Sequence, residues 1–141
     1  QTILYNYFVL SPNLFTIYLI KDFMKAINMT VTIYHNPRCG KSRNTLEILK
    51  SRGIEPKITE YLKTKLSENK IKNLLKKLNL EAQDIIRAKE AKELSINIDK
   101  MSQKDLIKAM SENPIIIERP IVVNNDKAII GRPPDKVIEI L

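Results

Sequence analysis

Two short segments in the first half of the chain are rich in β-branched and aromatic residues. Residues 31–35 (VTIYH) and 57–61 (KITEY) therefore predict strands. Between them, apolar residues recur at helical spacing in a segment that Ser42 can cap and Gly53 can end. A strand, a helix and a second strand in this order form a βαβ unit, so we expect the two strands to be parallel.

The middle of the chain has the apolar spacing of helices. Residues 67–78 place their apolar side chains on one face, with Ser67 as the N-cap and Asn79 at the end. A short helix is predicted over residues 82–88. A third helix over residues 102–111 begins with a Ser-x-x-Asp sequence that resembles a capping box. We interpret this region as a helical insertion.

The last part of the chain returns to a strand pattern. Residues 121–123 predict a strand, residues 124–126 (NND) a turn, and residues 127–130 the second strand of a hairpin. Pro134 suits the first position of a closing helix that runs to Leu141. The predicted fold class is α/β, a βαβ–ββα chain that forms a mixed four-stranded sheet with helices packed on it.

The first twenty residues contain no charged side chain and are long enough to cross a membrane. However, residues 11–13 (SPN) interrupt this stretch, and its lysines follow the apolar run instead of preceding it. We therefore expect no membrane span. We predict that residues 1–28 are a non-conforming extension, that residues 29–141 form one domain, and that Met29 is the natural start.

Composition narrows the classes of function. The net charge of +8 favours anionic partners, but no basic run is interleaved with aromatic residues, so we expect no nucleic-acid binding. The single cysteine excludes an intramolecular disulfide and a cysteine-rich metal site. We expect a cytoplasmic monomer with no bound metal or cofactor.

The surroundings of Cys39 favour a reactive thiol. It lies in the loop before the first predicted helix, where unpaired backbone N–H groups and the helix dipole stabilise a negative charge. Arg38, Lys41 and Arg43 add positive charge nearby, and the Ser42 hydroxyl can donate a hydrogen bond to the sulfur. Such an environment lowers the pKa of a thiol and makes it a nucleophile.

Three segments together carry a resemblance to a known family. Residues 30–49 (TVTIYHNPRCGKSRNTLEIL) are similar to the active-site segment of glutaredoxin-coupled arsenate reductases. Residues 116–123 (IIERPIVV) and 131–134 (GRPP) are similar to C-terminal motifs of the same family. The resemblance spans about residues 29–141 and implies a thioredoxin/glutaredoxin-like fold with a helical insertion.

The resemblance also implies an activity. The chain would reduce arsenate to arsenite through a Cys39 thiol–arsenate adduct, with glutathione as co-substrate, glutaredoxin as partner and no bound cofactor. The implied site residues are Cys39, His35 and Ser42 as catalytic residues, Arg87, Arg119 and Arg132 as substrate-binding residues, and Pro120 as a cis-proline.

Other classes of function fit the residues less well. A phosphate-binding P-loop needs glycine where His35 stands, and a tyrosine-phosphatase-like site needs arginine where Thr45 stands. A transcription regulator of the Spx type, which binds RNA polymerase, shares the implied fold and an RPI-like motif. Its redox switch usually uses CxxC, whereas residues 39–42 read CxxS here. This regulator and a related thiol oxidoreductase with another substrate are the alternatives.

Overall fold

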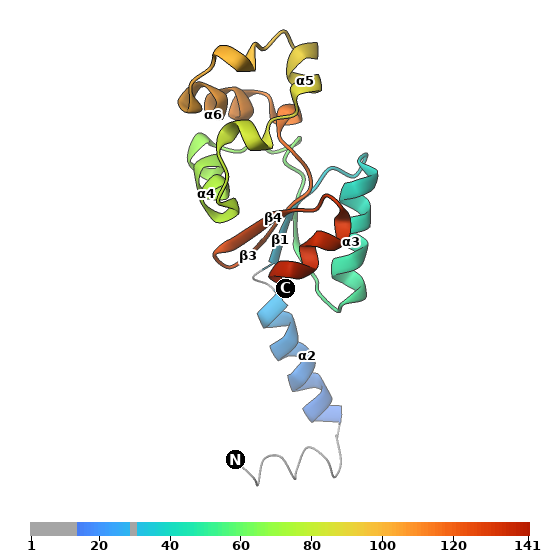
Figure 1. Ribbon diagram of the computed structural model, residues 1–141. Coiled ribbons are helices and arrows are strands. Elements are labelled where there is room, and N and C mark those ends of the chain that lie inside the picture. Colours follow the sequence, from blue (N-terminus) through green and yellow to red (C-terminus); the bar gives the residue numbers. More distant parts are fainter. Residues whose placement is uncertain (1–13, 29–30) are drawn as a thin grey trace.

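The structure is a computed structural model that describes residues 14–28 and 31–141. Its centre is a four-stranded sheet with the strand order β2-β1-β3-β4 (Figure 1). The strands are β1 (Val31–Tyr34), β2 (Lys57–Thr59), β3 (Ile121–Asn124) and β4 (Lys127–Ile130). β1 is parallel to β2 and antiparallel to β3, and β3 is antiparallel to β4. The predicted mixed sheet and its parallel βαβ unit are confirmed.

Helical segments surround the sheet. The α-helices are α2 (Leu14–Asn28), α3 (Gly40–Ser51), α4 (Glu68–Leu78), α5 (Ala88–Glu93) and α6 (Gln103–Glu112). The 3₁₀ segments are η1 (Ala82–Ile85), η2 (Ile98–Lys100), η3 (Pro114–Ile116) and η4 (Pro134–Ile140). In Figure 1, α3 and η4 lie side by side next to the sheet, while α4 and the rest of the insertion lie on its other side.

Alternating strand residues give the sheet two apolar faces. Val31, Ile33 and Val122 pack with Leu49 of α3 and Val137 of η4 in one buried cluster. The other cluster, which is larger, joins the opposite face of the sheet to the insertion, and includes Tyr34, Ile121, Val123, Leu74, Met110 and Ile116. Side chains that alternate between two faces in this way are expected when helices cover a sheet on both sides.

Local capping signals in the insertion were read correctly. The Ser67 hydroxyl accepts a hydrogen bond from the backbone of Lys70, and Asn79 ends α4 in the left-handed conformation with φ of 54°. Ser102 and Asp105 form the reciprocal hydrogen bonds of a capping box at the start of α6. These interactions involve only near neighbours in the sequence, so a pattern can reveal them.

The predicted helix over residues 82–88 was wrong. The structure has η1, then an extended residue at Ile86, and then α5, which begins after Arg87. Ile86 forms an isolated bridge with Ile117, and the Arg87 N–H donates to the Ile116 carbonyl at 2.8 Å. Pairing with this distant segment interrupts the helix.

Two smaller corrections concern the C-terminal part. Asn124 belongs to β3 and pairs with Lys127, so the hairpin turn is shorter than the predicted residues 124–126. The closing helix forms where it was expected, but as a 3₁₀ helix that ends at Ile140.

The N-terminal segment is described only from Leu14 onward. α2 exposes large apolar side chains, among them Leu14, Phe15 and Phe23. Within residues 14–28 and 31–141, no helix is both long enough and apolar enough to cross a membrane. The predicted interruption at residues 11–13 and the predicted start at Met29 lie outside the described residues.

Candidate active site

Cys39 is the N-cap of α3. The helix begins at Gly40, so its N-cap is Cys39. The prediction of Ser42 as the cap was wrong. Burial raises the pKa of the Cys39 thiol, but the backbone N–H of Ser42, the Arg119 side chain, the backbone N–H of Lys41 and the charge of Arg132 together lower it below its ordinary value. The partly buried sulfur therefore lies at the positive end of a helix, in surroundings that favour its thiolate form.

The Ser42 hydroxyl does not have the expected bond to the sulfur. It lies 2.7 Å from Nδ1 of His35 and accepts a hydrogen bond from the backbone N–H of Asn36 at 3.0 Å. Ser42 acts on the Cys39 sulfur through its backbone N–H and not through its hydroxyl. The Ser42 side chain thus fixes the loop that carries Cys39, because all three bonded residues are buried.

His35 supports the same loop from the end of β1. Its backbone N–H donates to the Thr59 carbonyl at 2.9 Å, which ties the loop to β2. Burial lowers the pKa of the His35 ring, Glu60 raises it, and the charges of Arg43 and Lys50 lower it, with a net decrease. A neutral ring can accept a hydrogen bond from the Ser42 hydroxyl at Nδ1.

Two arginines from the C-terminal half reach the cysteine. Nη2 of Arg132 donates to the Cys39 sulfur at 3.7 Å, although the two residues are 93 positions apart. The same guanidinium donates from Nε to the Arg119 carbonyl at 2.8 Å. Arg119 acts on the sulfur through its side chain, which also interacts with the Tyr61 hydroxyl and donates from Nη1 to the Ile115 carbonyl at 3.3 Å. The structure therefore brings both predicted arginines to Cys39.

Two glutamates that the sequence analysis missed bind the three arginines together. Oε1 of Glu118 lies 3.0 Å from Nη1 of Arg87 and 2.9 Å from Nε of Arg132. Glu90 pairs with Arg87 through Nε and Nη2, and its Oε1 lies 3.9 Å from Nη2 of Arg119. Arg87, the third predicted substrate-binding residue, thus belongs to one network with Arg119 and Arg132.

The network is almost neutral as a whole. Three guanidinium groups and two carboxylates leave a formal charge of +1, which an ionised Cys39 would balance. Burial lowers the pKa of Arg87, but its bonds to Glu90 and Glu118 raise it, with a net increase. Because Arg87 is occupied by both carboxylates, Arg119 and Arg132 have the more available donors for a ligand beside the sulfur.

Two cis-proline turns position the arginines. The Arg119–Pro120 bond is cis, as the resemblance implied, and the Arg132–Pro133 bond is cis as well, which was not anticipated. The Gly131 N–H donates to the Pro120 carbonyl at 2.9 Å, so the two turns are joined. A Cβ atom at Gly131 would lie 2.5 Å from Oγ1 of Thr45, which shows how closely this turn packs on α3.

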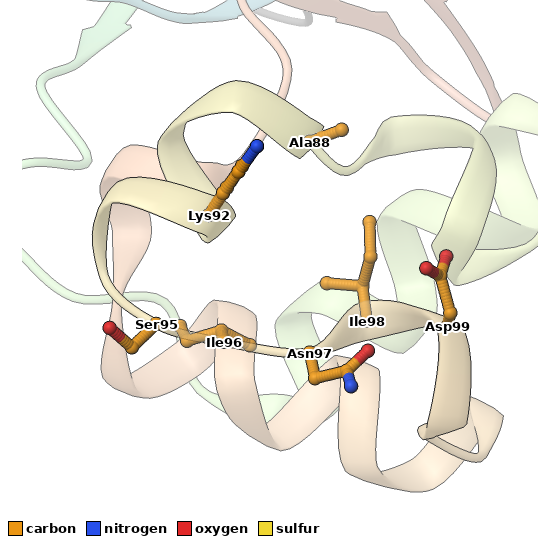
Figure 2. A pocket seen from close by; sticks show the side chains of 7 residues that line it. All are labelled: Ala88, Lys92, Ser95, Ile96, Asn97, Ile98 and Asp99. Atoms are coloured by element: carbon orange, nitrogen blue, oxygen red, sulfur yellow. The ribbon is translucent and has the colours of Figure 1, made fainter.

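A cavity of about 420 Å³ lies away from Cys39. Figure 2 shows it between α5 and the segment that leads into η2, with Lys92 and Asp99 among its polar lining residues. None of the seven implied site residues lines this cavity, and only Arg87 is adjacent in sequence to a lining residue, Ala88. Among the described residues, no cluster of three or more His, Cys, Asp or Glu side chains could hold a metal ion.

The fold and the site together define a thioredoxin-like domain with a cysteine at the N terminus of α3 and arginines gathered around its sulfur. The chain belongs to the ArsC family, whose family model matches residues 34–140. This assignment agrees with the resemblance that the three sequence motifs carried.

Individual relatives support the same assignment. The arsenate reductase of Haemophilus influenzae is 48% identical over 116 residues, which cover 80% of this chain and 100% of that protein. The uncharacterized protein YfgD of Escherichia coli K12 is 49% identical over 79% of this chain and 96% of its own length. The structure of an arsenate reductase from Vibrio cholerae matches with a TM-score of 0.76 at 46% identity, covering 80% of this chain and 98% of that one.

Proposed function

We propose that this chain reduces arsenate to arsenite, with Cys39 as the nucleophile and external thiols as the reductant. The observation that carries this proposal is the Arg132 guanidinium on the Cys39 sulfur, with Arg119 beside it. Relatives that match 80% of this chain and 98–100% of their own length bear the name arsenate reductase, which supports the same substrate.

The geometry suggests a role for each group in the first step. The Cys39 thiolate attacks arsenic(V), an S–As bond forms, and one arsenate oxygen leaves as water after it takes up protons. Arg119 and Arg132 donate hydrogen bonds to the remaining oxygens and offset their charge. Planar guanidinium groups suit this task because they match an oxyanion and stay protonated.

The electron balance requires thiols from outside the chain. One arsenic acid and two thiols give one arsenous acid, one disulfide and one water, and Cys39 is regenerated in the process. The chain has a single cysteine, so it cannot supply both thiols or form an internal disulfide. We assign the two external thiols to glutathione and glutaredoxin and place the reaction in the cytoplasm, where glutathione keeps thiols reduced.

The test is arsenate-dependent NADPH consumption with glutathione, glutaredoxin and glutathione reductase supplied. Turnover is expected for the unaltered chain and is abolished in Cys39→Ser. Arg119→Lys should lower kcat/KM about a hundredfold, because lysine cannot replace the two-pronged donor at the developing charge.

A matched control separates this effect from any general effect of replacing an arginine with a lysine. Arg52→Lys makes the same change at an exposed position beyond α3 and should leave turnover unchanged. If the unaltered chain shows no turnover while a known arsenate reductase is active in the same mixture, the proposal is wrong.

A further inference from the structure

The guanidinium of Arg43 turns back over the loop that carries Cys39. Arg43 lies one helical turn after the cysteine, and its Nη1 donates to the Pro37 carbonyl at 3.0 Å. Its Nη2 lies 3.8 Å from where a Cβ atom at Gly40 would stand. Helical side chains point toward the N terminus, and residues four apart share a face. The Arg43 guanidinium is therefore placed beside the chain on both sides of Cys39.

This guanidinium has hydrogen-bond donors that the protein does not use. Within residues 14–28 and 31–141, the Pro37 carbonyl is the only hydrogen-bond partner of the Arg43 side chain, and no ion pair includes it. Glu47 lies one turn further along α3, where an ion pair could form, yet Arg43 turns the other way. Because Arg43 is exposed, its Nε and Nη2 can bind an anionic group from another molecule.

The residues next to Cys39 add to the positive charge on this side of the site. Arg38 and Lys41 are both exposed, and neither side chain forms an ion pair in the part of the chain that the structure describes. The arginines of the network, in contrast, are paired with Glu90 and Glu118. Positive charge that no carboxylate of the protein offsets favours an anionic partner at this edge.

We propose that the Arg43 guanidinium binds a carboxylate of glutathione and so holds the glutathione sulfur beside Cys39. This assignment rests on the proposed function and deepens it, because it names the residue that recognises the thiol partner. Glutathione carries two carboxylates and one ammonium group, and a guanidinium matches a carboxylate in charge and shape. Pro37 and Gly40 are exposed, so a thiol can approach Cys39 along the edge beside Arg43.

Recognition of glutathione is measured without arsenate, by thiol–disulfide exchange at Cys39. The Cys39 thiolate attacks one sulfur of glutathione disulfide, a new S–S bond joins Cys39 to one glutathione, and the other glutathione leaves as its thiolate. The disulfide of mercaptoethanol reacts in the same way but carries no charge. Mass spectrometry at fixed pH gives both rate constants. Their ratio isolates recognition of the carboxylates, because a change in the reactivity of the Cys39 sulfur affects both reactions.

In Arg43→Gln, the rate constant for glutathione disulfide divided by that for the neutral disulfide should fall about fivefold, the effect of losing one exposed charge-assisted contact. Arg52→Gln is the matched control, since it makes the same change at the other end of α3 and should leave the ratio unchanged. If Arg43 only fixed the loop at Pro37, its loss would change both rate constants by the same factor.

An unchanged ratio in Arg43→Gln overturns this proposal, as does an equal fall in Arg52→Gln or a failure of Cys39 to react with glutathione disulfide. Arsenate turnover decides the proposed function separately. If the ratio falls in Arg43→Gln but the unaltered chain does not reduce arsenate, the glutathione site stands and the reduction is wrong. If the chain reduces arsenate and the ratio is unchanged, the reduction stands and the glutathione site is wrong.

Discussion

The chemistry at the scale of single residues depends on Cys39. Lowering the pKa of a thiol raises its thiolate fraction at neutral pH, but it also lowers the nucleophilicity of that thiolate, so ionisation alone gives a limited gain in rate. In the proposed mechanism, the larger contribution comes from Arg119 and Arg132, which hold the reacting anion.

The charge on Cys39 can be tested by alkylation. The pKa of the thiol lies below its ordinary value, so the thiolate persists at pH values where a free thiol is protonated. The rate of reaction with iodoacetamide should rise with pH through a midpoint below about 8.5. In Arg132→Gln the midpoint should move to higher pH, because a positive charge beside the sulfur is lost.

Arg52→Gln is the control for this titration, since the same change at an exposed position should not move the midpoint. A midpoint at or above the value of a free thiol in the unaltered chain would show that the helix terminus and the arginines do not ionise Cys39.

At the scale of elements, the site depends on the contact between α3 and the turn before η4. Gly131 packs where any Cβ would lie 2.5 Å from Oγ1 of Thr45 and 2.8 Å from Cγ of Pro120. Gly131→Ala should therefore force α3 and the two cis-proline turns apart. We expect a loss of about 1–3 kcal/mol in the free energy of unfolding, measured by urea denaturation.

Gly40→Ala provides the comparison, because a Cβ there would meet only Nη2 of Arg43 at an ordinary 3.8 Å. Its stability should be unchanged or slightly raised, as for other Gly→Ala changes within a helix. Equal stability of Gly131→Ala and the unaltered chain would contradict the packing described for this turn.

Elements fixed by neighbouring residues could be predicted from the sequence. The caps at Ser67, Asn79 and Ser102 involve contacts three or four residues apart, and their signatures were read correctly. The segment around Ile86 was misread because its conformation depends on a bridge to Ile117, thirty-one positions away. Periodicity carries no information about such a partner.

For the whole molecule, the site also combines features that the local sequence reveals with contacts that only the folded chain creates. The motif around Cys39 indicated a reactive thiol, but it could not show that the Ser42 hydroxyl bonds His35, so that Ser42 acts on the sulfur only through its backbone N–H. Glu90 and Glu118 were missed because the sequence does not show which arginines their carboxylates will meet, although Glu118 lies within the IIERPIVV segment. Only the folded chain brings them to the arginines.

Segments far apart in the sequence converge on Cys39. Arg119 precedes β3 and Arg132 follows β4, and both lie at Cys39 because the hairpin returns the chain to the end of β1. Arsenate that binds there and forms an S–As bond must block the sulfur. Blocking of the sulfur by arsenate therefore depends on the assembled site and not on any one residue.

The most direct measurement is the rate of Cys39 alkylation by iodoacetamide with and without arsenate, at matched ionic strength. Arsenate should slow the alkylation of Cys39 in a saturable manner. The Arg119→Lys variant should need a much higher arsenate concentration than the unaltered chain for the same protection. An alkylation rate that does not depend on arsenate would contradict this expectation.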